Sequence, residues 1–274
     1  MSFADAPIWL TGGLLAIVFI VVAQLGYLFH LRQGAAPEDV NVTHGAGQIA
    51  SASLALLGLL IGFTFAMAAE RYETRRAIVV QEANAISSAF DAYAFFDEPT
   101  RTRLRTLTGD YVRARLTFSA AGTDERRLDA VDARSGAAAR AISAELRTAI
   151  HSPANAALAT TVLRMTDEMF DLAATRRAGI DARVPPGVFV TLVLFAIATS
   201  GIVGYGLAAG RRRHGVASSA FFVLVAMTIA LIMDMDQPTE GGIQVSQAPL
   251  ERVGAAILHE LNESRAPAPV VGPR

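Results

Sequence analysis

The stretch IASASLALLGLLIGFTFAMAA (residues 49–69) decides the fold, because it runs without a charged side chain up to Glu70. A helix needs about twenty mainly apolar residues to cross the hydrocarbon core of a bilayer. Three other runs of this kind occur in the chain, and four exceed what the core of a soluble protein of this size needs. We therefore predict an all-α integral membrane protein with four transmembrane helices, at about residues 8–29, 48–69, 186–210 and 215–235.

The composition agrees with apolar spans that alternate with polar segments. Of the 274 residues, 52% are hydrophobic and 18% are charged, and the mean hydropathy is +0.38. The chain has no cysteine, which excludes disulfides, iron–sulfur clusters and thiolate metal sites. A net charge of −1 gives no field that attracts nucleic acid. All 24 basic residues are arginine, and with the many alanines this points to a bacterial inner membrane protein.

The charges in the short loops predict the orientation. Arg211–Arg213 follow the third span and Arg32 follows the first. Short loops rich in arginine stay in the cytoplasm, so both termini and the segment between the second and third spans are predicted outside. Arg71, Arg75 and Arg76 flank the other end of the second span and argue against this orientation, but long domains weigh less in the rule.

Residues 70–185 are predicted to form a helical extramembrane domain inserted between spans two and three. No glycine or proline occurs between Phe63 and Glu98, so the second span is expected to continue as one helix until Pro99. Helices joined by short turns pack most simply as an antiparallel bundle. Residues 237–274 are expected to form a separate tail with a short amphipathic helix capped by Ser246 or Gln247.

Two pairs of glycines have the spacing of close helix packing. Gly58 and Gly62 form a GxxxG in the second span, and Gly206 and Gly210 form one in the third. Such pairs let two helices approach closely in lipid. The alternative is chance spacing, because glycine and alanine are common in any apolar helix of an alanine-rich chain.

No recognisable catalytic motif is present. The five histidines do not pair at metal-ligand spacing, His259-Glu260 starts an HExxE rather than an HExxH, and no serine lies in a GxSxG. An intramembrane active site needs ionisable groups within the spans, and the predicted spans hold none at their centres. We therefore predict no enzymatic activity, and no catalytic, cofactor-binding or metal-ligating residues.

Polar residues cluster at two places in the sequence, and each cluster is a candidate functional site. On the extension of the second span, Glu82 follows Arg71 by eleven residues, about three helical turns, and Asn84 lies close by. These residues are candidates for a polar network, and the alternative is a structural contact with a neighbouring helix of the bundle.

The second polar group follows the fourth span. Asp234, Asp236 and Gln237 lie at the predicted membrane edge, and Ser246 follows in the tail. Carboxylates at such a place can ring the mouth of a pore and attract cations. The alternative, which we favour, is that they anchor the end of the span.

These same regions resemble one known family. Gly62-Phe63-Thr64, Arg71-Tyr72 and Glu82-Ala-Asn-Ala-Ile86 form one set of matching residues, and DMDQP (234–238) and VSQAPL (245–250) form the other. With two spans, a helical insert, two spans and this tail in order, the chain is similar to bacterial bestrophin-like membrane proteins, long classed as a domain of unknown function. The resemblance covers nearly the whole chain.

The resemblance implies kinship with bestrophins, which are pentameric anion channels with four-helix protomers. It implies that the second span lines a pore, where Phe63 and Phe65, on either side of Thr64, form an apolar constriction that gates by dewetting. An arginine often precedes the tail proline in this family, whereas this chain has Gln237, which argues against an anion-binding role there. A helical insert outside the cell would also differ from the cytosolic domain of bestrophins.

Two functions remain open from the sequence. The first is a homo-oligomeric channel in the lipid bilayer, with five copies on the bestrophin precedent, that conducts small anions. The alternative is a membrane sensor or scaffold whose extracytoplasmic helical domain binds a ligand or a partner protein. The short cytoplasmic loops leave no room for an output domain, which counts against the alternative.

Overall fold

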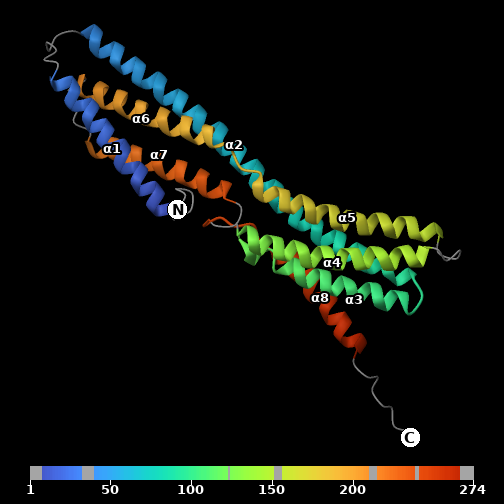
Figure 1. Ribbon diagram of the computed structural model, residues 1–274. Coiled ribbons are helices and arrows are strands. Elements are labelled where there is room, and N and C mark those ends of the chain that lie inside the picture. Colours follow the sequence, from blue (N-terminus) through green and yellow to red (C-terminus); the bar gives the residue numbers. More distant parts are fainter. Residues whose placement is uncertain are drawn as a thin grey trace, which may run out of the picture. The chain divides into compact units, whose positions relative to one another are not determined.

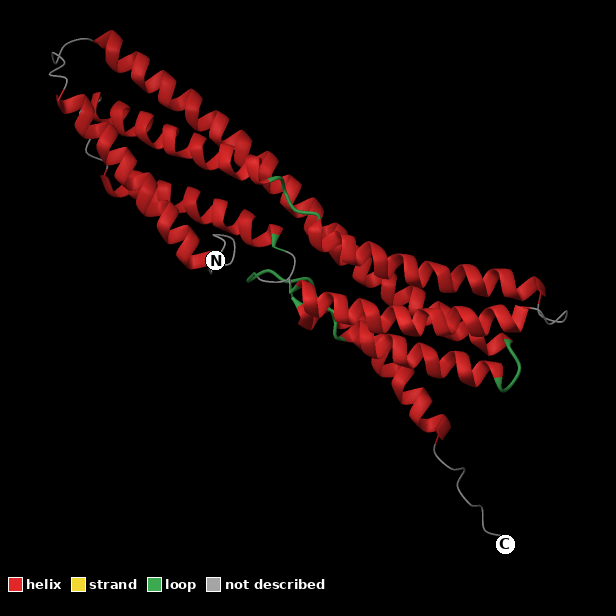
Figure 2. Cartoon of the chain, in the orientation of Figure 1, coloured by secondary structure: helices red, strands yellow, loops and turns green. Residues whose placement is uncertain are grey.

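The computed structural model describes residues 8–32, 40–122, 124–150, 156–209, 215–237 and 241–265. Within these ranges the chain forms eight α-helices, two short 3-10 helices and no strand. Figures 1 and 2 show how the helices are distributed along the chain. The all-helical prediction is therefore confirmed. In chain order the elements are α1 (Ile8–Arg32), α2 (Val40–Ala92), η2 (Tyr93–Phe95), α3 (Thr100–Leu116), η3 (Ser119–Ala121), α4 (Glu125–Ile150), α5 (Ala156–Asp181), α6 (Pro186–Ala209), α7 (Gly215–Asp236) and α8 (Ala248–Arg265).

Four helices are long enough and apolar enough to cross a membrane. They are α1, the segment from Gly45 to Phe95 that comprises most of α2 and the short η2, α6 from Pro186 to Ala208, and α7. The mean hydropathies of their most apolar stretches lie between 2.1 and 2.4. The four apolar spans predicted from the sequence are therefore present as helices among the described residues. The second of them belongs to a single helix of 53 residues, because nothing in α2 interrupts the backbone hydrogen bonds.

The chain divides into two compact units. Unit 1 comprises Met1–Tyr72 and Ala182–Gln244, and unit 2 comprises Glu73–Asp181 and Val245–Arg274. The α2 helix contributes residues to both units. Val245 and the helix α8 fall in unit 2, where α8 packs on α3.

In unit 1, α1 packs against both α6 and α7, and these helices run alongside one another in Figure 1. Their shared core is built from fully buried side chains such as Phe19 of α1, Leu192 of α6 and Phe222 and Ile229 of α7. Leu57 of α2 joins the same core. These helices are apolar on every side, so the core occupies only one stripe of each and other apolar side chains stay exposed.

Two glycines of α6 bring its backbone against α1. A Cβ atom on Gly26 of α1 would collide with the carbonyl oxygen of Gly201, and one on Gly204 would collide with the carbonyl oxygen of Ala23. Small residues at a crossing let helices in lipid gain van der Waals contact between backbones. The crossing of α1 and α6 thus depends on residues without side-chain bulk.

The two GxxxG pairs of the sequence, Gly58 with Gly62 and Gly206 with Gly210, do not form a close backbone contact of this kind among the described residues. A Cβ on Gly58 or Gly62 would meet no described atom within 4 Å, so that face of α2 packs against no described residue. A Cβ on Gly206 would lie 3.6 Å from the carbonyl oxygen of Ala46, an ordinary van der Waals contact, and Gly210 lies outside the described residues. The tight helix contact therefore lies between α1 and α6, which the GxxxG pattern did not indicate.

Unit 2 is a helical domain around its own core. Within it α3 packs on α4 and α8, and α4 packs on α5 (Figure 1). Each helix contributes a buried apolar side chain to the core, among them Ile86 of α2, Leu104 of α3, Ile142 of α4, Met169 of α5 and Ile257 of α8. Burying each such side chain stabilises the fold by about 1.5–3 kcal/mol.

The short amphipathic helix predicted in the tail is α8. Its buried residues Leu250, Ile257 and Leu261 recur at helical spacing on one face. The carbonyl of Gln247 accepts the first helical bond from Glu251 at 3.0 Å, which makes Gln247 the N-cap residue. The hydroxyl of Ser246 accepts a hydrogen bond from the amide of Ala248 at 3.4 Å, so both residues named in advance contribute to this end of the helix.

The crossing of α1 and α6 gives a first prediction. Gly26→Val should lower the stability of the purified protein by at least about 1–3 kcal/mol, because the new side chain forces the two backbones apart. Gly13→Val is the matched control, since a Cβ at Gly13 on the same helix meets nothing within 4 Å. Thermal unfolding in detergent measures both variants. Equal thermal unfolding midpoints for the two variants would contradict the close approach of the α1 and α6 backbones at Gly26.

Candidate functional site

The apolar segment of α2 has one buried and one exposed face. Leu57, Thr64 and Ala68 are buried, at the spacing of one helical face. The Thr64 hydroxyl donates to the carbonyl of Leu60 at 2.8 Å, so its polar group is satisfied within its own helix. Phe63 is 62% exposed and Phe65 is 42% exposed. The three pore candidates therefore separate: the phenylalanines point outward, and Thr64 points into unit 1.

The same segment is the least covered of the four apolar helices. In its most apolar stretch of 18 residues, 11% of the residues are buried, compared with 28% in α1, 28% in α6 and 33% in α7. The exposed face combines the bare backbone at Gly58 and Gly62 with the side chains of Leu59 and Phe63. An apolar face of this extent marks a surface that contacts lipid or another protein chain.

A buried ion-pair cluster lies in unit 2. The Glu82 carboxylate on α2 accepts hydrogen bonds from two guanidiniums, Arg115 Nε of α3 at 2.6 Å and Arg176 Nη1 of α5 at 2.7 Å. Arg176 also donates to the side-chain oxygen of Gln247, whose amide donates to the carbonyl of Val245 at 2.8 Å. Glu82, Arg115 and Arg176 are 0%, 1% and 7% exposed. The Glu82 carboxylate thus joins α2, α3 and α5, and Arg176 extends the cluster to Gln247 at the start of α8.

An aromatic ring completes the cluster. The guanidinium carbons of Arg115 and Arg176 lie 4.6 Å and 4.7 Å from the centroid of Phe118. A desolvated cation over a ring gains about 2 kcal/mol or more. Arg115 also lies 3.8 Å from the exposed edge carboxylate of Asp132 on α4. The two positive charges are therefore compensated by Glu82, by the ring and at longer range by Asp132.

Burial governs the electrostatics of the cluster. It lowers the pKa of the Arg176 guanidinium, and the charge and hydrogen bond of Glu82 oppose this shift. Burial also raises the pKa of the nearby Tyr111 hydroxyl, which donates to the carbonyl of Met169 at 3.4 Å. Both carboxylate oxygens of Glu82 are used by guanidiniums, so the cluster holds its helices in place and offers no general base.

The predicted network of Arg71, Glu82 and Asn84 divides in the structure. Glu82 enters the buried cluster, Asn84 on the same helix is exposed, and Arg71 is half-buried in unit 1. The sequence did not single out Arg115 or Arg176, because many arginines share these helices and nothing in the pattern shows which of them are buried. The available signal was Glu82 itself, a carboxylate among apolar neighbours.

The aspartates at the end of α7 bind backbone amides of unit 1. The two carboxylate oxygens of Asp234 accept hydrogen bonds from the amides of Gly242 and Ile243, both at 2.9 Å. Asp236 accepts one from the amide of Val184 at 2.9 Å, just before α6 begins. Each aspartate is 6% exposed. This geometry favours the anchoring role over a ring of carboxylates at a pore mouth.

The neighbouring residues of the tail serve the same local structure. The amide of Gln237 donates to the carbonyl of Asp234 at 3.1 Å and closes a turn. A Cβ on Gly241 would lie 3.0 Å from Asp234, so a bulkier residue there would press on the carboxylate. Ser246, in contrast, is exposed and belongs to the start of α8 in unit 2. The four tail residues proposed as one network therefore act in two separate places.

Comparison with known families identifies the chain. A family model described as the Bestrophin-like domain matches residues 12–250. The chain belongs to the bestrophin-like family. No curated protein and no solved structure matches it.

The bestrophin-like match encloses both polar sites. The cluster residues from Glu82 to Gln247 and the anchors Asp234 and Asp236 all lie between residues 12 and 250. Two of the sequence pieces that carried the resemblance, residues 82–86 and 245–250, meet at one side chain, because the guanidinium of Arg176 binds both Glu82 and Gln247. Among the described residues, no group of three or more acidic or histidine side chains is placed to hold a metal ion.

The buried cluster gives a second prediction. Glu82→Gln should destabilise the protein by about 3–5 kcal/mol, because two guanidiniums then remain buried without a counter-charge. Asn84→Ala is the control, because Asn84 lies on the same helix and is exposed. Chemical unfolding of the full-length protein compares the two. The role of Glu82 is refuted if its variant unfolds at the same denaturant concentration as the control.

The anchor at the end of α7 gives a third prediction. Asp234→Asn should cost about 1–3 kcal/mol and speed hydrogen–deuterium exchange at the amides of Gly242 and Ile243, because an amide nitrogen cannot accept their hydrogen bonds. Asp91→Asn, at an exposed position, removes the same charge and should leave both amides protected. Unchanged exchange in the Asp234 variant would contradict the anchoring role.

Proposed function

We propose that this bestrophin-like chain spans a bacterial inner membrane with α1, α2, α6 and α7 and assembles into a homo-oligomeric channel for small anions. The family includes anion channels, and the membership of this chain supports the proposal. The apolar helices of unit 1 have the length that the hydrocarbon core requires. Unit 2 lies in water, where ion pairs such as Arg103–Glu145, at 2.7 Å, stay at its surface.

The observation that carries the proposal is the exposed face of α2. A closed ring of identical subunits builds its central passage from the same helix of each copy. Such a helix must remain uncovered in the single chain, and α2 is the least buried of the four apolar helices. The bare backbone at Gly58 and Gly62 would let neighbouring copies approach closely around the axis.

Within this channel, Phe63 is the gating residue. Its side chain is the most exposed large apolar side chain of the α2 span, and a ring of phenylalanines narrows a pore by dewetting. Phe65 lies about 200° further around the helix and faces lipid or the neighbouring subunit instead. Thr64 positions the helix against unit 1 and does not line the pore. Both termini and unit 2 face the outside of the cell, as the arginine-rich loops indicate.

A second candidate function rests on a groove in unit 2. The groove, of about 550 Å³, follows α5 and is lined by charged and polar residues that include Arg164, Asp167 and Asp171. A sensor or scaffold protein would use such a surface for a ligand or a partner protein. The channel is preferred, because the sensor reading leaves the open face of α2 without a role.

Reconstitution into liposomes tests the channel. Purified protein should release trapped chloride, and Phe63→Ala should raise the flux severalfold by widening the constriction, whereas Phe63→Trp should lower it. Leu14→Ala is the control, because Leu14 is an exposed apolar residue of α1 away from the proposed pore. The proposal would be refuted if the liposomes retain their chloride and chemical cross-linking of the purified protein yields only monomers.

A further inference from the structure

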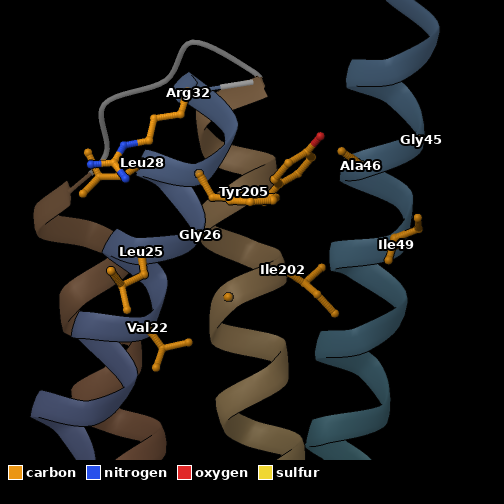
Figure 3. Close-up of a pocket in the computed structure, with 12 residues that line it drawn as sticks. Val22, Leu25, Gly26, Leu28, Arg32, Gly45, Ala46, Ile49, Ile202 and Tyr205 are labelled. Carbon is orange, nitrogen blue, oxygen red and sulfur yellow. The ribbon is translucent and has the colours of Figure 1, made fainter. Parts of the chain in front are cut away.

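A groove opens in unit 1 between α1, α2 and α6, at the ends of these helices that lead into residues 33–39 and 210–214. Its volume is about 890 Å³, within the range of 300–1,000 Å³ that is common for small-molecule sites. Figure 3 shows its walls, formed by Val22 and Leu25 of α1, Ile202 of α6 and Ile49 of α2. The groove is apolar along most of its length.

Small residues create this groove. On α2 the wall is made by Gly45 and Ala46, and a Cβ on Gly45 would meet nothing within 4 Å. Gly26 and Gly201 line it on the other side, where α1 and α6 already touch through their backbones. No described side chain fills the space that these glycines leave. An apolar space of this size at the surface of a membrane span is occupied by something apolar.

One end of the groove is cationic and polar. Arg32, the last residue of α1, lines it and has no ion-pair partner among the described residues. Tyr205 of α6 lines it as well, and Figure 3 shows its hydroxyl reaching toward Ala46. The ring of His30 packs edge-on against Tyr205, with centroids 4.6 Å apart, and orients it. The groove thus matches a molecule with an apolar body and an anionic end.

We propose that this groove binds one acyl chain of an anionic phospholipid, whose phosphate group is held by Arg32. The inference rests on the proposed placement of unit 1 in a membrane. Arginine at the end of a span lies at headgroup depth, where it gains about 1 kcal/mol from anionic lipid. A neutral lipid would fill the apolar walls but leave the guanidinium without a partner. The bound lipid would brace α2 against α1 and α6.

Native mass spectrometry of the purified full-length protein tests this proposal. The protein in detergent is titrated with phosphatidylglycerol or with phosphatidylcholine of identical acyl chains. Phosphatidylglycerol should bind about five- to tenfold more tightly, and Arg32→Gln should remove this preference. Gly45→Trp should abolish tight binding of both lipids by filling the groove. Gly47→Trp is its control, because Gly47 has equally open surroundings two residues away and does not line the groove.

Other outcomes would overturn the proposal. Equal binding of the two lipids, or an unchanged preference in Arg32→Gln, shows that the groove does not select an anionic headgroup. Disulfide cross-linking of Leu25→Cys protein in native membranes shows that a second copy fills the groove, because Leu25 lines it on α1 and not on the α2 face proposed for the pore. The absence of natural cysteines makes this readout clean. Extraction of the membranes with carbonate separates the two proposals, since a chain that washes off refutes the membrane placement itself.

Discussion

The α2 helix is one uninterrupted helix that contributes to the cores of two different units. Its first part carries an apolar span in unit 1, and its later part carries a carboxylate, Glu82, that is fully buried in unit 2. Both parts share one continuous series of backbone hydrogen bonds, since no residue within α2 breaks the helix. The remaining helices are arranged around these two requirements: α1, α6 and α7 form the core with Leu57, and α3, α4, α5 and α8 surround the second part.

Each unit uses a different means of holding helices together. In unit 1 the contacts are apolar, and α1 and α6 meet at glycines. Close backbone packing of this kind is the means by which helices associate in lipid, where no hydrophobic force acts between them. In unit 2 an ordinary apolar core does most of the work, and the buried ion pairs of Glu82 select which helices meet. Such a cluster contributes specificity more than net stability, because desolvation of the charges offsets most of their attraction.

The proposed channel and the proposed lipid site use one face of α2 at different heights. At about 100° per residue, Gly45 and Ile49 fall within about 40° of Phe63 around the helix, and Ile49 lies about 21 Å from Phe63 along its axis. A lipid in the groove would therefore brace the first turns of the apolar segment of α2, and Phe63 lies about four turns further along the same face. The acidic anchors at Asp234 and Asp236 hold the start of α6 and the end of α7 within unit 1.

The sequence alone determined the helices, because the length of an apolar run, and the absence of glycine and proline between Phe63 and Glu98, are local properties. It also indicated Glu82, Asp234 and the tail helix as notable. Only the tertiary structure decided which of the many arginines reach Glu82, that Asp234 and Asp236 bind backbone amides, and that α8 joins unit 2. It likewise placed the close crossing at Gly26 and Gly201 rather than at Gly58 and Gly62. These outcomes depend on contacts between residues far apart in the chain, for which the local pattern holds no information.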